Sequence, residues 1–189
     1  MPRRLQHSLL GLILVLYLAS SMGCQPRPPD RSDPAAQLVN YEIGINDLPP
    51  GWKLTSDFWT IEDFEGQSHV VAYGIDSEKN LKLVQTLFFY PDETHAKAAF
   101  PQLYATWFPS AWGKWPGANF IPSNPKDQYR FVCQNQEFAD PILTCISLQM
   151  HKQFISLVDA NMNPQSLTLA QLDGVLKAVD DRLNKIEFK

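Results

Sequence analysis

The sequence predicts an α+β domain in which one antiparallel sheet carries two helices. Six segments are rich in β-branched and aromatic residues, and two others have the three-and-four spacing of an amphipathic helix. Their order is three strands, a helix, three strands and a helix, which divides the chain into two βββα halves at about residues 40–110 and 120–189. Such halves bury their apolar surfaces best as a single sheet with both helices packed on the same face.

Turn-forming residues delimit the expected strands of the first half, at 52–61, 68–76 and 81–90. A helix is expected after Pro91, because apolar residues recur along one of its faces. Pro101 predicts a kink or a break in this helix, since proline lacks the amide hydrogen that a helix interior uses. The residues expected to face the core are Ala96, Ala99, Phe100, Leu103, Tyr104 and Trp107.

The second half is expected to repeat this order, with strands at 127–136, 142–150 and 153–160. Thr168 and Gln171 have the spacing of a capping box and mark the start of the last helix. An apolar stripe at helical spacing predicts that this helix packs on the core. The stripe consists of Leu169, Leu172, Leu176, Val179, Leu183 and Ile186.

The first residues of the chain have the order of a secretory signal peptide. Arg3 and Arg4 precede an apolar run at 9–19, and small residues follow the run up to Gly23. As a helix, the run would span roughly 16 Å, about half of a bilayer core, so it is too short to remain in the membrane. We therefore expect residues 1–23 to be removed on export.

The sequence Ser21-Met22-Gly23-Cys24 resembles the lipobox of bacterial lipoproteins. This resemblance implies cleavage after Gly23 and acylation of Cys24. The lipid would hold the protein at the cell membrane or the outer membrane, on the extracytoplasmic side. Ser21 and Gly23 equally suit ordinary signal peptidase, which would release a freely secreted protein. If the other two cysteines pair with each other, Cys24 is left as a single thiol, and lipidation would account for its presence.

A proline-rich tether is expected between the lipidated cysteine and the domain, over residues 24–39. It contains Pro26, Pro28, Pro29 and Pro34 among charged residues, and it has too little apolar material to fold. Fully extended, residues 25–38 of this tether would hold the domain up to roughly 40 Å from the membrane. The folded domain is expected to begin directly after it.

Cys133 and Cys145 are expected to form a disulfide across a hairpin. Pairing them centres the turn on Ala139 and places strands 129–136 and 142–149 opposite each other in register. Directly opposed residues lie close enough for a disulfide, and an exported protein meets an oxidising environment. Closing this loop should stabilise the fold by about 3 kcal/mol. The alternative, a redox-active pair, lacks the CxxC spacing.

Charge and motifs argue against several classes of function. The net charge is −4, and removing Arg3 and Arg4 with the signal leaves −6. No run of lysine and arginine could neutralise phosphates, so nucleic acid is not an expected partner. The histidines lack metal-ligand spacing, and the motifs of hydrolases and phosphate-binding loops are missing. No catalytic residue, metal or cofactor is predicted.

One aromatic segment, residues 104–122, is a candidate binding surface. Three of the five tryptophans fall within nine residues, and prolines interrupt any regular structure there. Aromatic side chains in loops are favoured contacts at interfaces, although the same rings can instead fill a gap in the core. The residues assigned to this surface are Phe108, Trp112, Trp115 and Phe120.

These features favour a non-enzymatic, lipid-anchored domain that binds a protein partner or a small ligand outside the cytoplasmic membrane. Two alternatives stay open. The first is a hydrolase-type lipoprotein whose site has no sequence motif, and the second is a structural or assembly lipoprotein.

Overall fold

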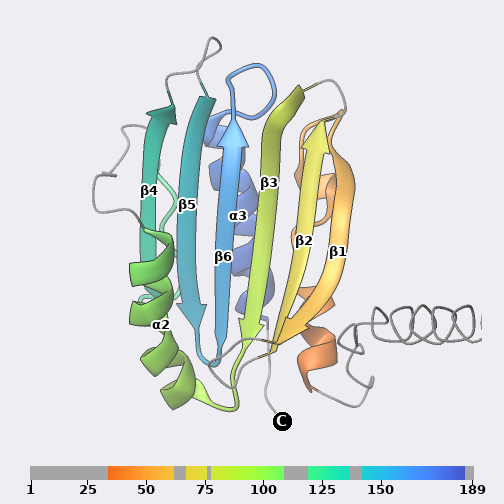
Figure 1. Cartoon of the computed structure of the whole chain (residues 1–189). Helices are drawn as coiled ribbons and strands as arrows, with labels where there is room; N and C mark the ends of the chain where they lie inside the picture. Colours follow the sequence, from red (N-terminus) through yellow and green to blue (C-terminus); the bar gives the residue numbers. More distant parts are fainter. Residues whose placement is uncertain (1–33, 62–66, 76–77, 109–118, 137–141, 186–189) are drawn as a thin grey trace, which may run out of the picture.

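The computed structural model of the chain describes residues 34–61, 67–75, 78–108, 119–136 and 142–185. They form a six-stranded antiparallel sheet with two α-helices and two short 3₁₀ helices (Figure 1). The strands are β1 (Lys53–Ile61), β2 (Gln67–Ile75), β3 (Glu78–Phe89), β4 (Gln128–Gln136), β5 (Ile142–His151) and β6 (Phe154–Met162). The helices are α2 (Glu93–Trp107), α3 (Leu169–Leu183), η1 (Pro34–Asn40) and η2 (Ile45–Asp47).

The strands lie in the order β1-β2-β3-β6-β5-β4, so the expected single antiparallel sheet is confirmed. Each group of three consecutive strands is a meander. The two groups meet at the centre of the sheet, where β3 pairs with β6 and Leu83 lies opposite Ala160. β-Branched and aromatic residues fill these strands because their side chains pack well on a pleated surface.

The two helices cover opposite faces of the sheet (Figure 1), which corrects the expectation that both pack on the same face. Alternate residues of a strand point to opposite faces. On β3, Leu83 and Leu87 join the buried cluster of α3, whereas Phe88 joins that of α2. The reason is that the central strands carry apolar side chains on both faces of the sheet. In β6, for example, the adjacent Leu157 and Val158 are both 2 % exposed. Such strands need cover on both sides.

Helix α2 follows β3 in the chain but packs on β5 and β6, so it covers strands of the second half instead of closing the first. Asp92 caps its N-terminus by accepting hydrogen bonds from the backbone N–H groups of Thr94 and His95. The helix runs without a break through Pro101. Its buried residues are Ala96, Ala99, Phe100 and Leu103.

Tyr104 and Trp107 were expected in the core, but they are 40 % and 42 % exposed. The helix ends at Trp107, and Phe108 turns into the core in their place. The ring of Tyr104 lies 4.8 Å from the ring of Phe108 and 5.9 Å from the guanidinium carbon of Arg130 on β4. The buried stripe of α2 is therefore shorter than its helical spacing predicts.

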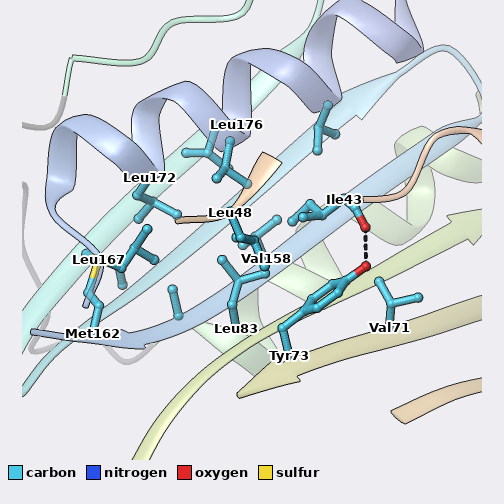
Figure 2. Close-up of a cluster of buried hydrophobic side chains, with 14 of the residues drawn as sticks. Ile43, Leu48, Val71, Tyr73, Leu83, Val158, Met162, Leu167, Leu172 and Leu176 are labelled. Atoms are coloured by element: carbon cyan, nitrogen blue, oxygen red, sulfur yellow. Dashed lines mark hydrogen bonds between the residues drawn. The ribbon is translucent and has the colours of Figure 1, made fainter. Parts of the chain in front are cut away.

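The larger of the two described clusters lies between α3 and the sheet (Figure 2). Leu172 and Leu176 of α3 pack with Leu83 and Val158 of the two central strands. Burial of such side chains is the main favourable term in folding, at about 25 cal/mol per Å² of apolar surface. This face therefore carries most of the core.

Residues 34–48 cover the part of this face over β2 and β3. Leu38, Ile43 and Leu48 are buried there, and the Ile43 carbonyl accepts a hydrogen bond from the Tyr73 hydroxyl (Figure 2). The sequence places Leu38 in the tether, but its side chain is fully buried. Leu38 is the first apolar anchor after the proline-rich stretch, so the folded part begins before residue 40.

The expected disulfide between Cys133 and Cys145 is present, and its residues lie directly opposite each other on β4 and β5. Their Cα atoms are 4.1 Å apart, and both residues belong to the α3-side cluster. The bond therefore crosslinks the edge strand β4 to the sheet from within the core.

Candidate functional site

An apolar pocket of about 300 Å³ lies where the sheet meets the start of α3. Three polar residues and five apolar ones line it. The polar residues are Asn135, Asn163 and Thr168, and the apolar residues are Leu143, Met162, Pro164, Leu167 and Leu169. Concave, mainly apolar pockets with a few polar groups are typical of small-ligand sites, whose volumes begin at about this size.

Strand register builds the floor of the pocket. Asn135 pairs with Leu143 across β4 and β5, and Leu143 pairs with Met162 across β5 and β6. The three side chains therefore form one row on the α3 face. The next row on this face contains the disulfide of Cys133 and Cys145. The crosslink thus fixes the edge strand β4 directly beside the pocket.

The chain between β6 and α3 forms the opposite wall. The Asn163 side-chain oxygen accepts hydrogen bonds from the backbone N–H groups of Gln165 and Ser166, which fixes the turn. The Ser166 carbonyl accepts a hydrogen bond from the Trp52 indole at 3.2 Å. Thr168 then starts α3 with the expected capping box. Both walls are held by contacts within the chain, and binding to such a preformed pocket loses little conformational entropy.

Among the described residues that line the pocket, none has a titratable side chain. Acid–base and nucleophilic catalysis need such a group within hydrogen-bond reach of the substrate. Met162 and Leu167 are 1 % exposed and belong to the core (Figure 2), whereas Leu143 and Leu169 are half-buried. The pocket is therefore an opening at one end of the core, and its chemistry suits binding.

A second depression, of about 480 Å³, lies between α3 and residues 119–123. Asp173 and Asp180 line it, but both carboxylates are hydrogen-bonded to that segment. Asp173 accepts from the Asn119 N–H at 3.0 Å, and Asp180 accepts from the N–H and the hydroxyl of Ser123 at 3.0 and 2.6 Å. These bonds fasten residues 119–123 to α3, so the two acids have a structural role.

A buried histidine–aspartate pair lies at the end of β5. His151 Nδ1 is 3.0 Å from Asp127 Oδ1, and both side chains are 3 % exposed. The Gln149 amide donates to Asp127 and to Asp180. The other ring nitrogen of His151 is buried and has no hydrogen-bond partner among the described residues. Within this part of the chain, the pair therefore has no hydroxyl or thiol in position to be activated as a nucleophile.

A second buried histidine joins three elements. His69 on β2 is 2 % exposed, and its ring nitrogens face Glu42 and, at 2.8 Å, Asp57 on β1. Each ring nitrogen of His69 therefore has a carboxylate partner. The ring also lies against Trp59, with 4.4 Å between centroids. Because both nitrogens are occupied, His69 serves to fasten residues 34–48 to the sheet.

The described residues of the predicted aromatic surface do not lie together in the fold. Phe108 lies in the α2-side cluster, while Phe120 is half-buried on the α3 side with its ring 5.2 Å from that of Tyr129. The two phenylalanines are thus on opposite faces of the sheet. Burial raises the pKa of Tyr129 well above its usual value, so its phenol stays protonated. The other predicted site residues lie outside the described part of the chain: Gly23, Cys24, Trp112 and Trp115.

Sequence reasoning missed the pocket because its residues have the pattern of a core. Leu143 and Met162 sit at inward positions of strands, and Leu169 continues the apolar stripe of α3. The one signal in the sequence was the polar stretch 163–166, which joins a strand to a helix and so must cross the end of the sheet.

Among the described residues, no group of three or more histidine, cysteine, aspartate and glutamate side chains could hold a metal ion. None of the helices in the described ranges is long and apolar enough to cross a membrane. No family model, curated protein or solved structure matches the chain.

Proposed function

We propose that this chain is a lipid-anchored domain that binds a small ligand outside the cytoplasmic membrane. The observation that carries the proposal is the apolar pocket beside α3, which has room for a ligand and, among its described lining residues, no titratable side chain. The anchor rests on the signal-like N-terminus that ends in Gly23 and Cys24. Residues 24–33 would then form a tether that reaches up to roughly 31 Å.

The pocket and the start of the folded part lie at opposite ends of the sheet. η1 is at the lower end in Figure 1, and the C-terminal end of β6 is at the upper end. In agreement, the ring of Tyr41 lies 5.7 Å from that of Phe154, the first residue of β6. β6 has nine residues, so the two ends are roughly 27 Å apart. A domain anchored through Cys24 could therefore present the pocket away from the membrane.

The anchor is tested by labelling with palmitate. Label should enter the wild-type protein, and the Cys24→Ser variant should take up none, because the thiol is the site of acylation. Equal labelling of both proteins, or unlabelled wild-type protein in the medium, would contradict the anchor and leave the pocket to be judged separately.

The pocket is tested by methyl NMR during titration with octanol. The methyl signals of Leu143, Met162 and Leu167 should shift, and the change Leu169→Phe should abolish the shifts by filling the space. Leu54→Phe makes the same substitution on the edge strand β1, at a side chain that is 52 % exposed, and should leave binding intact. Binding is ruled out if octanol, octanoate and benzyl alcohol all leave the pocket methyls unmoved.

A further inference from the structure

We infer that the ligand is a short aliphatic chain that ends in an uncharged, hydrogen-bonding group, with the chain in the pocket and the polar end at Asn135. This inference rests on the proposed function, because it names the class of ligand for the same pocket. Three properties of the pocket carry it: the chemistry of its walls, the free amide of Asn135 among its described lining residues, and its volume.

The walls of the pocket favour an aliphatic, uncharged body. None of the eight described residues that line it is charged or aromatic. An ionised group placed among Leu143, Met162 and Leu167 would lose its hydration and find no counter-charge, which is costly. A sugar or a planar ring would find no aromatic face to stack on. Leucine and methionine side chains instead give dispersion contacts along a methylene chain, and methionine adapts its shape to it.

Asn135 is the polar group that can receive the end of the ligand. The other two polar lining side chains are already used: Asn163 accepts two backbone hydrogen bonds, and the Thr168 hydroxyl is bonded to Gln171. The Asn135 amide has no such partner among the described residues, and the residue is exposed on the edge strand β4. A carboxamide both donates and accepts, so it suits a hydroxyl, an amide or an ester and does not call for a charge.

The volume sets the length of the chain. At roughly 30 Å³ for each water-sized group, a cavity of about 300 Å³ holds about ten non-hydrogen atoms. A chain of about eight carbons with one polar end fills this space. Long acyl chains would leave most of their methylene groups in water.

The ligand class is tested by comparing three probes in the exported chain carrying Cys24→Ser, which needs no detergent. The probes are octanol, octanoate and benzyl alcohol, and their affinities are read from the methyl shifts of Leu143, Met162 and Leu167. Octanol should bind at least tenfold more tightly than octanoate. The change Asn135→Leu should weaken octanol about fivefold, the effect of one hydrogen bond. Gln134→Leu, on the opposite face of β4, is the matched control and should change nothing.

The outcomes distinguish a failure of this inference from a failure of the proposed function. If octanoate or benzyl alcohol binds as well as octanol, the ligand class is wrong while binding in the pocket stands. If Asn135→Leu binds octanol like the wild type, the assignment of the polar end is overturned. If no probe moves the pocket methyls, the proposed function fails together with the inference. Unchanged methyl spectra of the free variants would show that they fold.

Discussion

The two faces of the sheet differ in how completely they are covered. On the α3 face, the helix and residues 34–48 together bury side chains from β2 through to β4. On the α2 face, the buried cluster draws on β3, β5 and β6 and includes none of the described side chains of β1 or β2. Phe58 of β1 and Val70 of β2 lie in one row with the buried Leu157. Phe58 is nevertheless 51 % exposed, and Val70 is half-buried.

The fuller cover of the α3 face explains why the preformed pocket lies on that side of the sheet. The densely packed α3 face holds the disulfide, and the pocket opens at its end, so the pocket walls are also parts of the core. Closely packed side chains move little, which keeps such walls in place. The open half of the α2 face has no comparable support among the described residues. We therefore expect substitutions on the α3 face to lower the stability of the fold more than substitutions on the α2 face.

The largest contrast should come from adjacent residues of β3. Leu83 points to the α3 face and is 0 % exposed, whereas Val84 points to the α2 face and is half-buried. Leu83→Ala should lower the free energy of unfolding by about 2–5 kcal/mol, because it leaves a cavity in the core. Val84→Ala should cost less than about 1 kcal/mol, since little apolar surface is lost from burial. Urea denaturation measures both, and equal losses would show that the two faces contribute alike.

Removing the disulfide should have the next largest effect. The double change Cys133→Ala with Cys145→Ala should lower the free energy of unfolding by about 3 kcal/mol, because the unfolded chain gains freedom. The β4 edge beside the pocket should also loosen, which amide exchange of residues 128–135 would detect. A variant that melts like the wild type would mean that the crosslink is dispensable and that packing alone holds β4.

A smaller effect is expected from His69, which joins residues 34–48 to the α3 face. His69→Ala leaves Glu42, only 11 % exposed, without its partner and should cost about 1–3 kcal/mol. The amides of residues 38–48 should exchange faster. His95 is the matched control, since its pair with Asp92 lies at the surface, and His95→Ala should change stability little. Unchanged exchange in His69→Ala would show that apolar burial alone holds this segment.

Local patterns predicted the parts of this fold that depend on neighbours in sequence. The alternation of the strands, the register of Cys133 with Cys145 and the stripe of α3 could all be read from short windows. The face covered by α2 could not, because it depends on the pairing of β3 with β6. Gln85 of β3 hydrogen-bonds Ser156 of β6 across 71 residues, and no short pattern encodes that contact. The division into two halves accordingly stays a prediction, since α2 packs on the strands of the other half.

The sequence did not predict the pocket, for a related physical reason. Its apolar residues satisfy the same spacing rules as core residues, and only the path of the chain at residues 163–168 leaves them uncovered. The candidate site could therefore be found only from the packed structure. The aromatic surface was predicted from composition. Composition gives the kind of side chain in a segment but not the face of the sheet on which each side chain lies.

The smallest effect is expected at the cap of α2, the helix of the less covered face. Hydrogen bonds from the backbone and the side chain of His95 lower the pKa of Asp92. A lowered pKa in the folded state means that the stabilisation is complete above the unfolded pKa, about 4, and is lost as the pH falls through the lower folded value. Asp92→Ala should therefore melt earlier than the wild type at neutral pH, with the gap closing in acid. Asp92→Asn keeps a capping oxygen that does not titrate, so its difference from Asp92→Ala should persist at low pH. If the gap between Asp92→Ala and the wild type is the same at neutral and acid pH, the ionised carboxylate is not what caps α2.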